Sequence, residues 1–337
     1  MKKKIFSLLI AIVAAATSVQ AQQISVVSPS GATSLYRTLP EAIEGAQSGS
    51  VVYLPGGGFT ISDEIKITKK LTIIGIGHKA NSGNVDGSTI ISGNLWFNDG
   101  SSNSAVMGCY ITGGVNIGDG DAEVNNILVK FCNLNSVQVK NSTCSGTIIN
   151  QNYIRNNSSF GGSSVTINNN VIHRIKSVNV GTIKNNCILG ALSGPNSYDA
   201  AIFDVYNTIF TGNIFYGSYP FFINLWSARC SGNENIYNLY CRAEQADFYF
   251  TNDSISTINA TASDIFINYN NWAISPSSDF HFKDEYKQYE SQVGIYAGSG
   301  FDDSQMAPVP YIMYKDVPDK TDAEGKLKVR IRVKANQ

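Results

Sequence analysis

One short phrase returns along the middle of the chain and limits the folds that this sequence can adopt. Each copy consists of a short alternating strand, an asparagine-rich corner and a second short strand, and the clearest copies span residues 148–154, 165–172 and 182–188. Aligned on their last asparagines, Asn152, Asn170 and Asn186, the copies are 18 and 16 residues apart. A unit this short cannot bury its own apolar face, so the copies must stack on one another.

Looser copies extend the phrase in both directions, at residues 109–111 and 132–134 upstream and at 213–215 and 235–237 downstream. Asparagine tolerates left-handed backbone at a corner, and its side-chain amide can both donate and accept hydrogen bonds. In a stack of coils, such a corner can bond to the corners above and below it. We therefore expect Asn152, Asn170 and Asn186 to lie one above the next, as a ladder.

A short amphipathic helix is predicted ahead of the repeats. Thr38 can cap its first free amides, Glu41 can reach back to the cap, and Pro40 is tolerated in the first turn. Its apolar face would comprise Leu39, Ala42, Ile43 and Ala46. Such a helix would cover the apolar end that the first coil otherwise exposes.

Three segments of the amino-terminal region, residues 39–43, 53–59 and 67–75, resemble the opening of the right-handed parallel β-helix superfamily that contains pectate lyases and polygalacturonases. The asparagine corners resemble the asparagine ladder of that superfamily, and the likeness covers residues 24 to about 275. It implies an all-β fold, a single-stranded right-handed parallel β-helix with an N-terminal capping α-helix. We expect a signal peptide at 1–21, the β-helix with its cap at 22–300 and a C-terminal tail at 301–337.

The first 21 residues have the pattern of an export signal, with three lysines, an apolar run over residues 5–16 and a small-x-small cleavage site before Gln22. No later run of about 18 apolar residues exists, so we predict no transmembrane segment. The mature protein is expected to be exported, to the periplasm, the cell surface or the extracellular space. The end of the signal and the tail from Gly325 are similar to exported proteins of Bacteroidetes.

The net charge of the mature chain limits the classes of partner that we expect. Without the three signal lysines, 22 basic and 26 acidic residues remain, and this lack of a basic excess argues against nucleic acid as a binding partner.

Three of the six cysteines fall inside the repeated phrase, where a small thiol fills a core position: Cys109, Cys132 and Cys187. Cys230 and Cys241 are the candidate pair for a disulfide.

A candidate binding surface follows from the repeat. If the second residue after each ladder position points inward, the third should point outward, and this column contains Arg155, His173 and Tyr216. Arg174 and Lys176 lie close by in the sequence. Cations beside an aromatic ring can hold the carboxylates and ring faces of an acidic sugar chain. These five residues are our candidates for substrate binding, and an ordinary solvated surface is the alternative.

Catalytic residues are not assigned. The tripeptide 174–176 copies one that polygalacturonases use, but the paired carboxylates that inverting hydrolysis requires are missing around it. Pectate lyases need calcium, and Asp119, Asp121 and Glu123 form the one dense acidic group in the coils that could gather oxygen ligands. A solvated turn is the alternative there. The three histidines are scattered, so no zinc site is predicted.

The last strand is predicted from strict alternation over residues 326–334, with four aliphatic residues on one face and five cations on the other. It would be a half-buried arm of a hairpin that turns at residues 322–325. Its cations can protect an exposed edge or meet an acidic polymer, and the strand can dock to another copy or another partner. The oligomeric state stays open.

Together these patterns predict an exported β-helix protein that binds extracellular or cell-surface polysaccharide. One alternative is an enzyme that acts on acidic polysaccharide, with a polysaccharide lyase favoured over a glycoside hydrolase. A second alternative is a structural or adhesion rod on the cell surface. Fold resemblance alone does not decide among the three.

Overall fold

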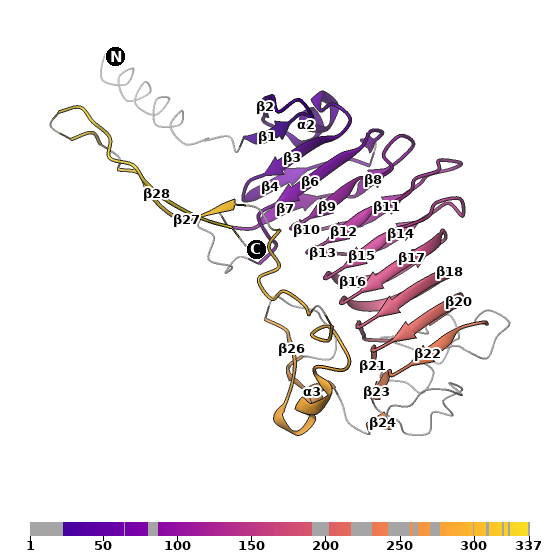
Figure 1. Ribbon diagram of the computed structural model, residues 1–337. Coiled ribbons are helices and arrows are strands. Elements are labelled where there is room, and N and C mark those ends of the chain that lie inside the picture. The colour runs from indigo at the N-terminus through magenta and orange to yellow at the C-terminus, as the bar shows by residue number, and fades with distance from the viewer. Residues whose placement is uncertain are drawn as a thin grey trace, which may run out of the picture.

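The computed structural model describes residues 23–63, 65–79, 87–190, 202–216, 231–241, 257–258, 262–269, 277–298, 300–307, 310–318, 320–322 and 324–335. The predicted signal at 1–21 and Cys230 lie outside these ranges. Within them the protein is all-β, with one long and largely parallel sheet of many strands (Figure 1).

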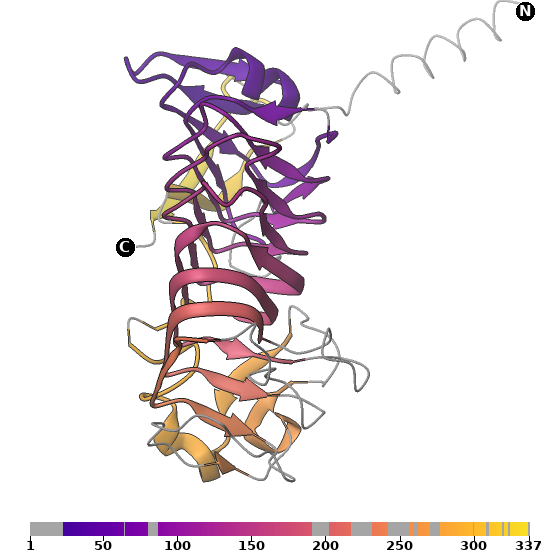
Figure 2. The same ribbon diagram turned by 90° about the vertical axis from the view of Figure 1, so that its right-hand side faces the viewer.

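Most strands pair in parallel with a strand one turn of chain later, so the strands gather into three columns (Figures 1 and 2). The first column contains β3 (Ser50–Leu54), β6 (Leu71–Gly75), β9 (Ala105–Met107), β12 (Leu128–Lys130), β15 (Ile148–Asn150), β17 (Ser163–Asn168), the last part of β18 (Val171–Lys184), the last part of β20 (Ile202–Thr211) and β22 (Glu234–Ile236). The second contains β4 (Gly57–Thr60), β7 (Thr89–Ser92), β10 (Tyr110–Ile111), β13 (Asn133–Leu134), the first parts of β16 (Tyr153–Phe160) and β18, then β19 (Cys187–Ile188), β21 (Ile214–Tyr216), β23 (Leu239–Cys241) and β24 (Thr257–Ile258). The third contains β5 (Lys66–Ile67), β8 (Leu95–Phe97), β11 (Val115–Ile117), β14 (Val137–Val139), the last part of β16, the middle of β18 and the first part of β20.

The amino-terminal end of the stack is formed by two antiparallel strands and a helix. Strand β1 (Ile24–Val27) pairs with β2 (Thr33–Tyr36) on one side and with β3 on the other. Helix α2 (Leu39–Gly45) begins at the predicted capping box, in which the Glu41 amide donates to Thr38 Oγ1 and the Thr38 amide donates to the Glu41 carboxylate. All four residues of its predicted apolar face are buried in the main core: Leu39, Ala42, Ile43 and Ala46.

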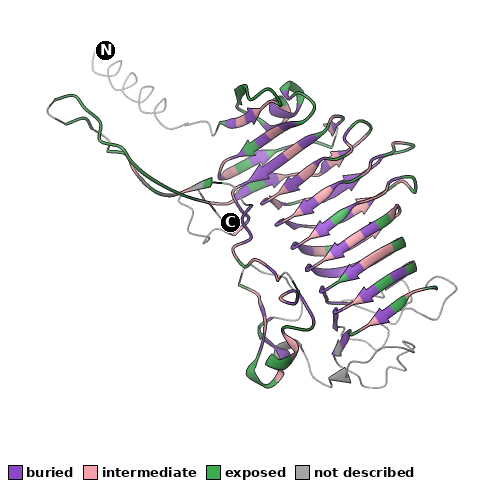
Figure 3. Cartoon of the chain, viewed as in Figure 1, coloured by how far each residue is buried: buried purple, intermediate pink, exposed green. Residues whose placement is uncertain are grey.

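The main core lies between the columns, where alternate residues of each strand point inward (Figure 3). The second residue after each ladder position was predicted to point inward, and it does. On successive coils these fully buried residues are Ile111, Leu134, Ile154, Ile172 and Ile188. The short repeats therefore bury their apolar faces only by stacking.

The predicted ladder is confirmed, and it is longer than the three copies that indicated it. Its members, all fully buried, are Asn152, Asn170, Asn186, Asn213 and Asn238. The backbone amide of each donates to the side-chain oxygen of the next at 2.8–3.0 Å, and the side-chain amide donates to the same atom at 2.9–3.0 Å. The last member corrects the sequence alignment, which placed Asn235 at this position instead of Asn238.

Two cysteines continue the ladder upstream of Asn152. The Cys132 amide donates to Asn152 Oδ1 at 2.9 Å, as a ladder asparagine would. Its thiol is 3.2 Å from the carbonyl of Lys130 and 3.8 Å from that of Val106, the positions that correspond to the two carbonyls bonded by the Asn152 side chain. Burial raises the pKa of Cys132 to about 12. The prediction that Cys109 and Cys132 fill core positions is therefore confirmed.

Cys187 occupies a different position, one residue after the ladder, and is buried in a second cluster outside the main core. Cys241 belongs to the same cluster and forms no disulfide with any cysteine in the part of the chain that the structure describes. Its predicted partner Cys230 lies outside the described residues.

Beyond the coils, the chain turns back and runs along them as a strap, which we define as residues 277–307 (Figure 1). It contains β26 (Asp279–Phe282) and the 3-10 helix η2 (Asp284–Tyr289). Before it come α3 (Ala262–Ile265) and β25 (Phe266–Asn268), and β25 pairs with β26 in an antiparallel sheet of its own. The likeness to the β-helix superfamily predicted coils as far as about residue 275. That prediction is wrong for 265–268, and residues 270–276 lie outside the described part.

The strap is bonded to the corners of successive coils, at the residue before each ladder position. These corner residues have left-handed backbone, with φ of 56° at Gln151, 53° at Asn169 and 55° at Asn185. The Asn169 side chain donates to the carbonyls of Ile295 and Ala297 at 2.9 and 3.0 Å, and Asn185 donates to Ala297 at 3.2 Å. Gln151 Oε1 accepts the backbone amide of residue 302 at 2.9 Å.

A second hydrophobic cluster fills the space under the strap. From the coils it takes the outward-facing residues that directly follow the ladder: Tyr153, Val171, Cys187, Ile214 and Leu239. From the strap it takes Phe280, Phe282, Val293, Ile295 and Phe301. Because all ten are buried, the strap is an integral part of the fold and spans the boundary predicted at residue 300.

The chain closes with the predicted hairpin, formed by β27 (Pro310–Asp316) and β28 (Arg330–Ala335). Its turn lies where it was expected, because the Gly325 amide donates to Asp322 O at 3.0 Å and the Asp322 amide donates to Lys326 O. The last arm is not half-buried as predicted, however, since residues 324–334 are all exposed (Figure 3). Among the described residues, no helix is long and apolar enough to cross a membrane.

Candidate functional site

The structure does not bring the predicted binding residues together on one surface. Arg155 is half-buried in the second column and is held by its neighbours. Its guanidinium donates to Tyr110 Oη at 2.8 Å and to the Ile111 carbonyl at 2.9 Å, and it lies 4.8 Å from the centre of the Tyr110 ring. These bonds fix Arg155 and Tyr110 as one cation–aromatic pair at the surface.

His173 and Arg174 do not face solvent, because only 4% and 8% of their surfaces are exposed. Leu189, in the same predicted outward column, packs in the cluster under the strap, so this column is covered in the later coils. Burial lowers the pKa of His173, which favours its neutral form. The side chain of Tyr216 lies outside the described part of the structure.

Lys176 belongs to another surface, the outward face of the third column, where one residue per coil lies in register with the next. This row, which we call the Trp96 strip, consists of Lys66, Trp96, Asn116, Gln138, Ser159, Lys176 and Phe203. At about 4.8 Å per coil, the strip is about 30 Å long. The structure thus separates Lys176 from Arg155 and His173.

Trp96 is the centre of the polar part of the strip. The ammonium groups of Lys66 and Lys140 lie 5.6 and 4.2 Å from the centre of its indole ring. Its indole nitrogen is 3.4 Å from an oxygen of Asp63, which also accepts from the Asn94 side chain at 2.8 Å. The ring is therefore set among cations, a carboxylate and an amide, and it is still partly exposed.

The two coils after Trp96 add amides to the same row. Asn116 is in register with Trp96, and Gln138 is in register with Asn116. The Gln138 side chain donates to the Asn157 carbonyl at 2.9 Å, which fixes its orientation. Only 7% of the Asn116 surface is exposed, so Gln138 is the accessible amide of the row. An aromatic ring, this amide and the flanking cations offer both stacking and hydrogen bonding to a polar chain molecule.

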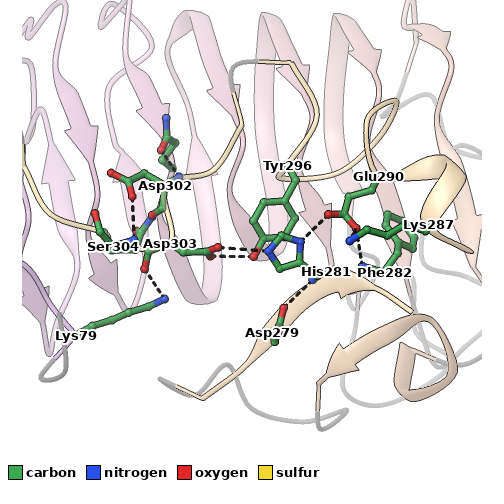
Figure 4. Close-up of polar contacts among 12 residues, drawn as sticks. Lys79, Asp279, His281, Phe282, Lys287, Glu290, Tyr296, Asp302, Asp303 and Ser304 are labelled. Carbon is green, nitrogen blue, oxygen red and sulfur yellow. Dashed lines mark hydrogen bonds and ion pairs between the residues drawn. The ribbon is translucent and has the colours of Figure 1, made fainter. Parts of the chain in front are cut away.

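A second polar constellation lies on the strap around His281 (Figure 4). Its ring stacks on that of Tyr296 with 3.7 Å between centres and 6° between planes. One ring nitrogen, Nδ1, is 2.6 Å from a Glu290 oxygen, and the other, Nε2, is 3.4 Å from an oxygen of Asp303. The Tyr296 hydroxyl donates to the other Asp303 oxygen at 2.9 Å. We call these four residues the His281 cluster.

Electrostatics in this cluster favour a charged Glu290 and a neutral Tyr296 phenol. Burial and the adjacent charge of Asp303 raise the pKa of Tyr296. At Glu290, burial favours the protonated form, but hydrogen bonds from Lys287 and His281 outweigh it and lower the pKa below its usual value. His281 is held between these two carboxylates, with about a third of its side chain exposed.

The acidic loop proposed for calcium makes other contacts. Asp119 forms an ion pair with Lys66, which lowers the pKa of the Asp119 carboxyl through its hydrogen bond and its charge. Glu123 accepts a hydrogen bond from the Asn125 side chain at 2.8 Å. In the described ranges, no three His, Cys, Asp or Glu residues are grouped to hold a metal ion.

Sequence reasoning missed both constellations. Trp96 and Gln138 are 42 residues apart and lie outside the clear copies of the repeat. The alternation of Lys66 with Ile67, and of Trp96 with Leu95 and Phe97, is the signal that could have placed them on an outward face.

Comparison of the chain with protein-family models, with curated proteins and with solved structures finds no match.

Proposed function

We propose that this is an exported protein of the right-handed parallel β-helix kind that binds extracellular or cell-surface polysaccharide along the Trp96 strip. The asparagine ladder, the three strand columns and the helix at the start of the stack support this fold. The export pattern of residues 1–21 supports the location.

The observation that carries the binding function is the composition and register of the strip around Trp96. An indole ring, the Gln138 amide and two lysines lie on one face of four adjacent coils. Aromatic rings stack on the apolar faces of sugars, and amides and ammonium groups bond to hydroxyls and carboxylates. A straight row with one group per coil suits a linear polymer better than a compact ligand.

A glycan-binding experiment tests this proposal. The mature protein would be screened against acidic and neutral polysaccharides by affinity electrophoresis, and the best ligand would be titrated by calorimetry. Trp96→Ala should weaken binding at least tenfold, which corresponds to about 1.4 kcal/mol. Gln138→Ala, which removes a hydrogen-bonding amide from the same row, should weaken it several-fold.

Tyr53→Ala is the matched control, because Tyr53 is an aromatic residue with 37% of its surface exposed on the first column. It should bind like the wild type. No binding to any polysaccharide, or equal losses for the Trp96 and Tyr53 variants, would remove the Trp96 strip as the binding surface.

A second candidate function is lyase chemistry on an acidic polysaccharide, and the His281 cluster favours it. Elimination needs a base to remove a proton beside a carboxylate, and His281, oriented by Glu290, is the described group best placed to accept one. Incubation with polyuronates would be followed by the ultraviolet absorbance of unsaturated products. Product formation that His281→Asn abolishes supports this function, and no product from any polyuronate excludes it.

A further inference from the structure

The C-terminal hairpin exposes an apolar face that nothing in the described part of the chain covers. Four aliphatic residues of its second arm lie at alternate positions with about half of their surface exposed: Leu327 at 46%, Val329 at 46%, Ile331 at 55% and Val333 at 57%. Val317, which directly follows the first arm, is 43% exposed. The hairpin is a separate two-stranded sheet that projects from the stack (Figure 1).

The two faces of its second arm differ in chemistry, whereas the first arm is mixed, since Lys315 is the register partner of Ile331. Val333 pairs with Ile312, and because paired residues in an antiparallel sheet share a face, Ile312 joins the apolar side. Arg332 pairs with Tyr314, and its guanidinium lies 5.9 Å from the Tyr314 ring on the opposite side. Within β28, alternation puts Arg330, Arg332 and Lys334 on that opposite side, and Lys326 and Lys328 continue the same alternation in the sequence before the strand.

A bare two-stranded hairpin is marginal in water and needs packing against a hydrophobic surface. The positions of the charged residues decide which surface can pack on the apolar face of this hairpin. Pairing two hairpins edge to edge would bring two rows of cations alongside each other, which is repulsive. Packing them face to face through the apolar sides of their second arms leaves both rows of second-arm cations pointing outward into solvent.

We propose that the hairpin is a self-association surface, which packs its apolar face against the same face of a second copy of this chain. The contact is self-complementary, so it closes as a two-fold dimer and does not propagate. In the dimer, Val329 and Ile331 of each copy lie at the centre of a small four-stranded sandwich. This inference is independent of polysaccharide binding, because the Trp96 strip lies on another surface.

The other occupant that this chain offers is the body of a second copy. Residues 310–335 carry seven basic and four acidic residues, whereas residues 23–309 carry 15 basic and 22 acidic residues. Hairpin-on-body docking would use that attraction, would weaken in salt and would build open-ended chains of molecules. Face-to-face packing predicts the opposite salt dependence, because salt screens the repulsion between the two cationic hairpins.

Sedimentation velocity on the full mature chain, over a hundredfold range of concentration and at low and high salt, tests this inference. We expect a monomer–dimer equilibrium that tightens with salt, and a dimer dissociation constant raised at least tenfold by Ile331→Asn. Ile148→Asn, at a 41% exposed position on the first column, is the control and should leave the dimer unchanged.

A wild-type chain that stays monomeric at every concentration would overturn the proposal. So would a series of higher oligomers that dissolves in salt, which would assign the hairpin to the acidic body instead. Equal dimerisation by wild type and Ile331→Asn would also overturn it. Glycan binding by Ile331→Asn should match the wild type, which keeps this outcome distinct from a failure of the Trp96 strip.

Discussion

Removing one ladder side chain should destabilise the whole stack, and Asn170 is the most informative position. Its side-chain oxygen accepts from both the backbone and the side-chain amide of Asn152, at 2.9 and 3.0 Å. Its side-chain amide donates to the carbonyls of Ile149 and Asn168, at 2.9 and 2.8 Å, and to Asn186 Oδ1 at 3.0 Å. Asn170→Ala removes all five bonds at a fully buried corner.

The expected loss follows from what is left unpaired. The Asn152 backbone amide loses its acceptor, and the carbonyls of Ile149 and Asn168 each lose a donor, although the Asn168 carbonyl keeps the Gln151 amide at 3.1 Å. A buried polar group without a partner costs about 1–3 kcal/mol, so the variant should lose about 3–5 kcal/mol of unfolding free energy. For a domain of this size, that corresponds to a fall in Tm of about 6–15 °C.

Asn170→Asp refines this prediction. A carboxylate still accepts from Asn152 but cannot donate to the two carbonyls, and burial raises its folded-state pKa. A raised carboxyl pKa means that the folded state binds the proton more tightly, so the variant should gain stability as pH falls from neutral toward 4. Wild-type protein should not gain stability over that range.

Denaturant unfolding followed by circular dichroism measures these differences. Asn156→Ala is the control, because Asn156 is exposed and its side chain accepts only from the neighbouring amide of residue 157. It should change stability by less than about 0.5 kcal/mol. A loss for Asn170→Ala as small as that of the control would refute the ladder as a source of stability.

Three further predictions concern the thiols and the strap. Cys132 should resist alkylation at pH 8 in the native state and react on unfolding, because it is fully buried and its pKa is raised to about 12; mass spectrometry reads the labelling. Asn169→Ala should loosen the strap, because the Ile295 carbonyl loses its side-chain donor and the Ala297 carbonyl loses one of its donors and keeps Asn185. Hydrogen exchange should speed up at residues 294–303, with a stability loss of about 1–3 kcal/mol. Because the pKa of Glu290 is lowered in the folded state, its contribution to the stability of the strap is fully present above the ordinary carboxyl pKa of 4.5 and is lost as pH falls through the lowered value. Hydrogen exchange at residues 281–296 should therefore rise in acid in the wild type and not in Glu290→Gln.

The sequence predicted the parts of this fold that depend on local pattern. The ladder corners, the capping box at Thr38 and the turn before Gly325 each follow from a few adjacent residues. The ladder position in the last coils was misplaced, at Asn235 instead of Asn238, because the spacing grows from 16 residues to 27 and 25 there. In these longer coils, a sequence alignment that is shifted by three residues still appears to match the repeated phrase.

The strap and the candidate site could not be predicted in the same way. Asn169 and Ile295 are 126 residues apart, and nothing near Ile295 shows that it packs on a corner of the stack. Leu189, in the outward column predicted at His173, packs in the cluster under that strap, so its burial was equally invisible in the sequence. The Trp96 strip arises from the register of coils of unequal length, which only the stacked structure reveals.

The account rests on the claim that residues far apart in sequence form one row on the third column, and disulfide trapping tests it directly. Gln138 and Ser159 are register partners, at a separation of about 4.8 Å that suits a disulfide, whereas Gln138 and Lys66 are three coils, about 14 Å, apart. Under mild oxidation, Gln138→Cys with Ser159→Cys should cross-link in nearly every molecule, and Gln138→Cys with Lys66→Cys should not. Equal cross-linking of the two pairs, or none in the first, would contradict the stacked row and the binding surface built on it.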